Sequence, residues 1–150
     1  MPGHKLGKGI SDDIADNLLK LDITELCGSG KNSFPYNEVE KAQTLAAKAF
    51  GADRTIFLVN GSTCGIHAVI MSMCKPKDKL ILGRDSHKSV INAMILNGVE
   101  PVFIKPGVND DFGIPTVITP AQIESAIKKN PEVAGVFITR PNYYGICSDI

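Results

Sequence analysis

Apolar and polar positions alternate along this chain in two distinct patterns. In residues 36–52 the apolar side chains recur at helical spacing, and Gly51 stands where such a helix would end. Residues 54–60, RTIFLVN, are instead a short, apolar and β-rich run, which predicts a buried strand. Residues 61–74 follow as a turn that leads into a second helix. A helix, a strand and a further helix are therefore expected in the first half of the chain.

The same alternation continues toward the carboxyl end. One helix start is especially clear, because Thr119 precedes Pro120 at the first helical position and Gln122 stands in the capping-box position. Strand and helix in regular turn predict an α/β domain of three layers, in which helices cover both faces of a mostly parallel sheet. The remaining expected elements are strands at 79–84, 100–106 and 133–141 and helices at 87–98 and 119–130.

Composition narrows the class of protein. A chain of 150 residues with 43% hydrophobic residues can bury a core and form one domain. Lys and Arg number 16, as do Asp and Glu, so no basic field attracts nucleic acid. The four cysteines are scattered without a zinc-like spacing, and no apolar run approaches a membrane span. We expect a cytoplasmic protein with reduced thiols and a small neutral or zwitterionic partner, without metal, nucleic acid or membrane.

Ligands of open parallel sheets bind in the loops beyond the carboxyl ends of the strands. The first such loop is VNGSTCG, in which Gly61 lets the backbone come close while Ser62 and Thr63 add hydroxyl groups at a helix start. Amides at a helix start point outward and the helix dipole favours negative charge, so this turn suits a phosphate. The same residues also suit a plain helix cap, and this stretch alone favours neither interpretation.

Two better-known phosphate loops are excluded. Residues 28–33, GSGKNS, are similar to a Walker A loop, but Glu25 stands where its first glycine belongs and Asn32 where Ser or Thr should follow the lysine. The dinucleotide pattern G-x-G-x-x-G follows none of the expected strands. Both observations argue against ATP and NAD as ligands.

Two further loops contain candidate side chains. In RDSHKS, residues 84–89, His87 can stack on a flat ring or simply cap the following helix, and Lys88 by itself is more often solvated than catalytic. In RPNYYG, residues 140–145, the two tyrosines can line a ligand pocket or pack at the sheet edge. His67 falls within a helical pattern and is interpreted as a packed or satisfied core histidine.

Five stretches taken together resemble the Orn/Lys/Arg decarboxylase family, whose members use pyridoxal 5'-phosphate (PLP) on the aspartate-aminotransferase type of fold. The likeness runs through nearly the whole chain, and the motifs occur in the family's order, which makes it more specific than any one motif. The stretches are MPGHK at 1–5, LDITEL at 21–26, residues 40–68, RDSHKS at 84–89 and RPNYYG at 140–145.

The resemblance implies a role for each candidate residue. Ser62 and Thr63, with Gly61 and the backbone amides near Cys64, hold the phosphate of PLP, and His87 stacks on the pyridine ring. Lys88 merely follows that histidine, although the Ser-His-Lys order superficially echoes the family's Schiff-base lysine motif. The implied fold is an incomplete PLP-dependent transferase-like large domain of fold type I.

The family's Schiff-base lysine and the aspartate that pairs with the ring nitrogen are expected further along than residue 150. The resemblance therefore implies an amino-terminal part of the large domain, with a segment at about 1–36, an α/β portion at about 37–150 and no small carboxy-terminal domain. It implies decarboxylation of lysine, arginine or ornithine, as in polyamine biosynthesis, by a full-length homodimer or higher homo-oligomer. The isolated chain is expected to be inactive. The alternative is a non-catalytic truncated paralogue that keeps a phosphate-binding or dimerisation surface.

Overall fold

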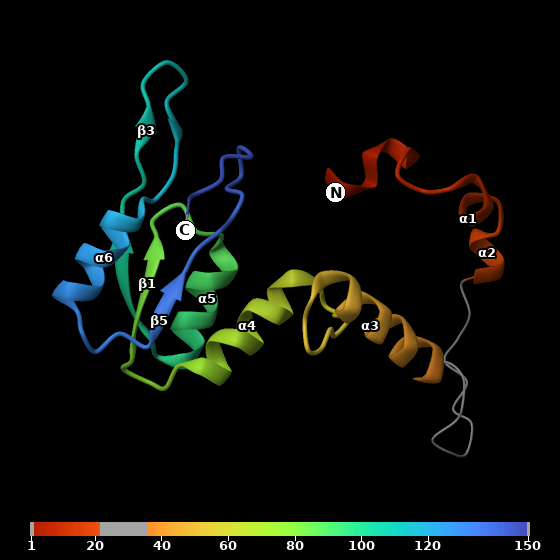
Figure 1. Ribbon diagram of the computed structural model, residues 1–150, viewed down its shortest axis with the longest axis horizontal. Helices are drawn as coiled ribbons and strands as arrows, with labels where there is room; N and C mark the ends of the chain where they lie inside the picture. The colour runs from red at the N-terminus through yellow and green to blue at the C-terminus, as the bar shows by residue number, and fades with distance from the viewer. Residues whose placement is uncertain (1, 22–35, 150) are drawn as a thin grey trace. The chain divides into compact units, whose positions relative to one another are not determined.

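The computed structural model describes residues 2–21 and 36–149 of the chain (Figure 1). The GSGKNS stretch, most of LDITEL and Cys27 lie outside the described residues. The chain divides into two compact units, Met1–Phe57 and Leu58–Ile150. The division expected near residue 36 stays a prediction.

The first unit is helical. Its longest helix, α3, ends as predicted at Gly51, whose positive φ of 65° is readily adopted by glycine. Ala47 is buried, and its carbonyl accepts a hydrogen bond from the Ala52 amide at 2.9 Å, which closes the helix end. The helices of this unit are the 3-10 helix η1 (Pro2–Gly7), α1 (Asp12–Asp16), α2 (Leu18–Leu21) and α3 (Tyr36–Phe50).

The strand predicted at 54–60 is wrong. The segment has no strand conformation, and Ile56 and Val59 are 73% and 94% exposed. Its apolar run was a sound sign of burial, but a strand also needs a neighbour that takes up its backbone hydrogen bonds. None of the described strands pairs with this segment. One of its amides, that of Phe57, donates instead to the Gln43 side chain at 2.9 Å.

The second unit contains the predicted parallel sheet. Strands β1 (Lys79–Gly83), β2 (Glu100–Ile104) and β5 (Gly135–Phe137) lie in the order β2-β1-β5, and both pairings are parallel. Ile81 at the centre of β1 is opposite Val102 on one side and Val136 on the other. The strand expected at 133–141 is thus present but shorter than its apolar run.

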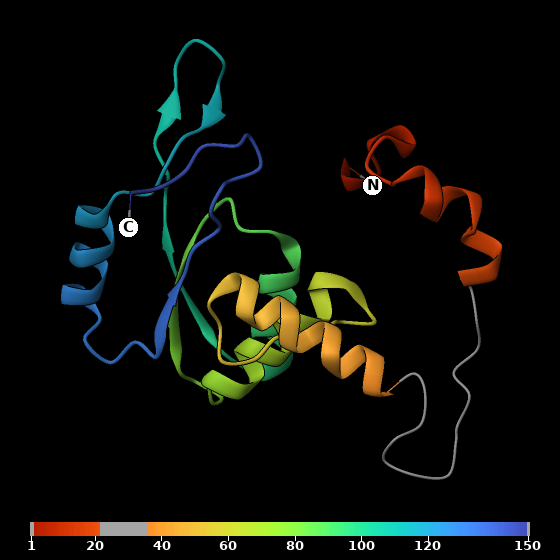
Figure 2. The ribbon, with the colours of Figure 1, turned by 45° about the vertical axis from the view of Figure 1, so that its right-hand side comes forward.

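Helices cover both faces of this sheet, which confirms the three-layer α/β/α architecture (Figures 1 and 2). Alternate residues of β1 point to opposite faces. Leu82 packs in a cluster with residues of α4 (Gly61–Met73) and α5 (Lys88–Asn97), whereas Ile81 packs in a cluster against α6 (Pro120–Lys129).

The ends of the helices follow the predicted signals. At the start of α6 the Thr119 hydroxyl accepts from the Gln122 amide at 3.3 Å, and the Gln122 side chain accepts from the Thr119 amide at 2.9 Å. Gly98 ends α5 in the left-handed conformation with φ of 68°. Asn97, just before it, donates to the carbonyl of Cys74 at 2.8 Å, so the carboxyl ends of α4 and α5 are tied together.

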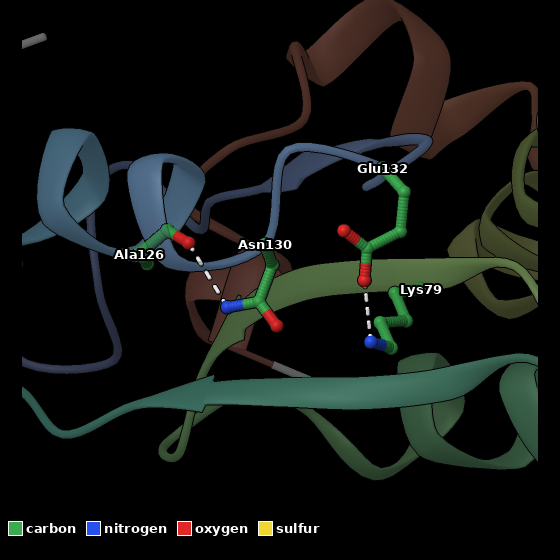
Figure 3. A network of polar contacts seen from close by, with 4 residues as sticks. All are labelled: Lys79, Ala126, Asn130 and Glu132. Atoms are coloured by element: carbon green, nitrogen blue, oxygen red, sulfur yellow. Dashed lines mark hydrogen bonds and ion pairs between the residues drawn. The ribbon is translucent and has the colours of Figure 1, made fainter.

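Polar contacts also fix the amino end of the sheet (Figure 3). Lys79, the first residue of β1, forms an ion pair with Glu132 in the loop between α6 and β5. In the same loop Asn130 donates from its side chain to the carbonyl of Ala126 at 3.0 Å, which closes the end of α6. These contacts position the loop that leads into β5.

An antiparallel hairpin was not predicted. Its strands are β3 (Val108–Asn109) and β4 (Ile114–Pro115), and it extends beyond the carboxyl ends of the sheet strands in both views (Figures 1 and 2). Among the described helices, none has the length and apolar character needed to cross a membrane.

Candidate functional site

The first turn of α4 is the predicted phosphate-binding turn. Gly61 begins the helix with φ of 65°, and a Cβ atom built on it would meet nothing within 4 Å. Asn60 occupies the cap position, yet its side chain makes no capping hydrogen bond. The amides of a first helical turn have no partner within the helix, so an uncapped turn leaves them available to an anion. The plain-cap interpretation therefore loses the side-chain bond on which it depends.

Side chains of the same turn add polar groups. Ser62, Thr63 and Cys64 are all exposed on the first turn of α4, and the Cys64 thiol is free. Two hydroxyl groups beside outward-pointing amides are a donor set that suits phosphate oxygens. The structure thus places the four predicted residues, 61–64, together on one helical turn.

His87 is the N-cap of α5, as the simpler of its two interpretations predicted. Its Nδ1 accepts a hydrogen bond from the Ser89 amide at 3.2 Å and lies 2.8 Å from the Ser89 Oγ. With Nδ1 as acceptor, the neutral ring carries its proton on Nε2. Ser89 is buried, whereas His87 is exposed, so one edge of the imidazole is held while the ring itself faces solvent. Capping does not preclude stacking, which stays a prediction.

The two candidate turns belong to helices that share one end. Because Asn97 binds the carbonyl of Cys74, α4 and α5 end together near the amino end of the sheet. Both helices therefore begin away from that point, and α5 begins directly after β1 ends (Figure 1). The exposed Lys88 is the first residue of α5.

The third loop, 140–145, is organised by a residue that the sequence interpretation missed. The Asn142 side chain donates to the carbonyls of Thr116 at 3.0 Å and Pro115 at 3.2 Å. Its Oδ1 accepts from the amides of Tyr144 and Ile146, both at 3.0 Å. An asparagine directly after a proline in a loop was the available signal, because Asn side chains often bond the backbone of their own turn.

Neither interpretation of the two tyrosines is supported in the second unit. Tyr143 is 93% exposed and Tyr144 is 51% exposed, and their rings contact each other edge to face at 5.2 Å. A pocket does lie nearby, lined by Gly83, Ser86, Asn142 and Ser148 among others, but its volume is about 20 Å³. A space of that size holds about one water molecule and no cofactor.

A larger cavity of about 540 Å³ lies in the first unit, between α3 and residues 52–56. It contains none of the residues predicted for the phosphate or for the ring. His67 is partly buried, but its Nε2 is buried without a hydrogen-bond partner, so the interpretation as a satisfied histidine is wrong. Across the part of the chain that the structure describes, no group of three or more His, Cys, Asp or Glu side chains could hold a metal ion.

The cysteines differ in environment. Burial, reinforced by the charge of Asp78, raises the pKa of the Cys74 thiol above its ordinary value. Cys64 and Cys147 are exposed and free. Nucleophilic thiol chemistry requires the thiolate, so Cys74 is the least reactive of the three.

Solved structures place this architecture in a class of enzymes. The PLP-bound C-S lyase from Staphylococcus hominis matches 87% of this chain and 32% of its own, with a TM-score of 0.50 and 15% identity. The Escherichia coli constitutive lysine decarboxylase matches 93% of this chain and 20% of its own, with a TM-score of 0.60 and 25% identity. The fold is therefore part of the fold type I of PLP-dependent enzymes.

The sequence comparisons are more specific. Residues 1–150 match the Orn/Lys/Arg decarboxylase major domain, and the chain belongs to this family. It is 39% identical to the uncharacterized protein YaaO of Bacillus subtilis and 34% identical to the arginine decarboxylase of the same organism. Both matches cover 100% of this chain, and 32% and 31% of those proteins. The chain thus spans about a third of the length of these relatives.

Proposed function

We propose that residues 1–150 supply the phosphate-binding turn and the ring-contacting histidine of a PLP-dependent decarboxylase that acts on lysine, arginine or ornithine. The observation that carries the proposal is the uncapped first turn of α4, which begins at Gly61 with positive φ. Membership of the Orn/Lys/Arg decarboxylase family supports both the cofactor and the class of substrate. Relatives named arginine decarboxylase and lysine decarboxylase support the basic amino acid.

The residues of the α4 turn fit a phosphate group. Gly61 leaves open space where a side chain would stand, so phosphate oxygens can approach the backbone amides. Ser62 and Thr63 add hydroxyl donors, and the positive end of the helix dipole favours the phosphate charge. These residues bind and orient the cofactor and take no part in bond breaking.

His87 would hold the ring of the cofactor. Its Nδ1 edge is occupied by Ser89, so the imidazole has a fixed orientation and a neutral charge when it meets the pyridine face. When bound, PLP supplies an electron sink for the pair of electrons left behind as CO2 departs. A stacked ring fixes the plane of the cofactor, and a fixed plane favours breaking of the bond to the carboxylate.

The covalent lysine of the site is, in this proposal, none of the lysines in residues 1–150. Lys88 is exposed at the first position of α5, beside the histidine proposed to lie on the ring. In this arrangement it lies next to the cofactor without holding it.

The proposal is tested by titrating the chain with PLP and following absorbance or tryptophan-free fluorescence transfer from tyrosine. Saturable binding is expected, and Ser62→Ala combined with Thr63→Ala should weaken it about tenfold or more, as two charge-assisted hydrogen bonds are lost. Ser72→Ala is the matched control, because Ser72 is an exposed serine on the same helix whose hydroxyl bonds the Val69 carbonyl. Equal affinity in all three proteins would contradict the proposal.

Borohydride reduction of the PLP-treated chain, followed by peptide mass spectrometry, tests the assignment of Lys88. We expect no lysine to be labelled preferentially, and no turnover of lysine, arginine or ornithine by the chain with PLP. Specific labelling of Lys88 would contradict its role as a bystander. PLP binding without turnover by a complete protein that contains this chain would favour the non-catalytic paralogue.

A further inference from the structure

The β3–β4 hairpin carries an exposed aromatic side chain away from the sheet (Figures 1 and 2). Phe112 lies in its turn with 76% of its surface exposed, directly after Asp110 and Asp111. Both aspartates are exposed, and neither forms an ion pair with a residue that the structure describes. The hairpin tip, defined as residues 110–112, is therefore an apolar ring beside two negative charges.

Hydrogen bonds hold this tip in place. The Phe112 amide donates to the Asn109 side chain at 3.0 Å, and the Gly113 amide donates to the Asn109 carbonyl at 2.8 Å. The base of the hairpin is tied to the neighbouring loop by Asn142, which donates to the Thr116 carbonyl at 3.0 Å. An aromatic side chain on a preorganised turn loses little conformational entropy on binding, as do the anchors of protein interfaces.

A groove of opposite charge lies on the same unit, between β2 and α6. Its volume is about 510 Å³, and Phe103, which is 43% exposed, and Ala126 provide apolar surface. Lys105 and Lys129 line it, and neither forms an ion pair with a described residue. The Arg84 guanidinium lies 5.0 Å from the centroid of the Phe103 ring and adds positive charge. The groove is open along one side because β2 is an outer strand of the sheet.

We propose that the hairpin tip of one copy of this chain docks into the β2–α6 groove of a second copy, with the reciprocal contact on the other side. Phe112 then fills the apolar part of the groove, and Asp110 and Asp111 meet Lys105 and Lys129. Each contact pairs two negative charges with two positive charges, which selects the partner and its orientation. A two-fold axis makes both contacts equivalent and closes the assembly as a dimer.

The charges and the direction of the hairpin together point to a second copy as the occupant. The hairpin leaves the sheet where β2 ends, whereas the groove runs back along β2 and α6, so the tip faces away from the groove of its own chain (Figure 1). The chain carries both complementary halves and has no net charge, with 16 basic and 16 acidic residues. A reciprocal contact uses both halves at once and leaves neither charge cluster unpaired.

Charge exchange tests the proposal. One variant carries Asp110→Lys with Asp111→Lys, and the other carries Lys105→Glu with Lys129→Glu. Each variant alone should lose self-association by about tenfold or more, because like charges then face each other. An equimolar mixture should restore it, since both contacts between the two variants pair opposite charges. Sedimentation equilibrium measures the association, and circular dichroism verifies that each variant is folded.

Two matched controls separate this contact from general stickiness. Phe112→Ala should weaken association, whereas Phe50→Ala, which removes an exposed phenylalanine of α3, should not. Asp12→Lys with Asp13→Lys reverses an equal charge at exposed positions of α1 and should also leave association unchanged. A chain that stays monomeric, or association that survives either charge reversal, overturns the proposal, as does a mixture that fails to associate.

Discussion

The Nδ1 atom of His87 accepts a hydrogen bond from the Ser89 amide at 3.2 Å and lies 2.8 Å from the Ser89 hydroxyl oxygen. One histidine is therefore both the cap of α5 and the proposed contact of the cofactor ring. The buried Ser89 fixes the edge of the imidazole, and the exposed remainder of the ring is free to meet a ligand. The two roles use different parts of the side chain and can be separated by substitution.

His87→Asn should separate them. Asparagine is a good N-cap, so this variant should keep the stability of the chain, whereas His87→Ala should lose about 1 kcal/mol. Both variants lack an aromatic ring and should weaken PLP binding about threefold to tenfold, the usual value of an aromatic stacking contact. Urea denaturation and PLP titration measure the two effects. If His87→Asn bound PLP as tightly as the original chain, the ring would have no part in holding the cofactor.

Thiol labelling should detect occupancy of the α4 turn. In the native chain iodoacetamide should modify the exposed Cys64 and Cys147 and spare Cys74, whose burial raises the pKa of its thiol. PLP should slow labelling of Cys64 in proportion to the fraction of sites occupied, and leave Cys147 unchanged. Peptide mass spectrometry reads each site separately. Equal protection of both thiols would indicate binding elsewhere.

Asn142→Asp should destabilise the second unit by about 1–3 kcal/mol. The carboxylate can still accept from the amides of Tyr144 and Ile146, but it offers no donor to the carbonyls of Pro115 and Thr116. The midpoint of urea denaturation checks this result, with Asn92→Asp as the control at an exposed position of α5. A loss confined to Asn142→Ala, with Asn142→Asp unchanged, would mean that the two donated bonds contribute nothing.

The Lys79–Glu132 pair should make stability depend on pH at both extremes (Figure 3). The hydrogen bond from Lys79 lowers the pKa of Glu132, so this contribution is present above the unfolded pKa and is lost as pH falls through the folded pKa. The same bond raises the pKa of Lys79, so its contribution is present below the unfolded pKa and is lost as pH rises through the folded pKa.

Both partners of this pair are in contact with solvent, so the effect should be small and should diminish in high salt. Lys79→Gln should flatten the pH profile of the urea midpoint at both ends, whereas Glu124→Gln, which retains the Lys79–Glu132 pair, should preserve it. A profile that Lys79→Gln leaves unchanged would show that other groups cause the pH dependence.

Local signals account for the parts of the fold that the sequence predicted correctly. The capping box of Thr119 and Gln122 and the left-handed Gly98 each depend on residues within one helical turn. The phosphate-binding turn was predicted for the same reason, since Gly61, Ser62 and Thr63 are consecutive.

The features that were missed depend on residues far apart in the sequence. Residues 54–60 have the composition of a strand, but composition cannot supply a neighbouring strand. Asn142 acts on a carbonyl 26 residues away, and no spacing rule connects the two positions. Ser89 was overlooked because its importance comes from burial against His87, which the sequence does not show.

The most direct test of the proposed PLP site is a titration of the ¹⁵N-labelled chain with PLP, followed by NMR. The account predicts that the largest amide shifts occur at Gly61, Ser62, Thr63 and Cys64, together with a shift of the His87 ring nitrogens. Inorganic phosphate should shift the four amides and leave the His87 ring unaffected. Shifts that are absent from the first turn of α4, or that cluster at the cavity beside α3, would contradict the account.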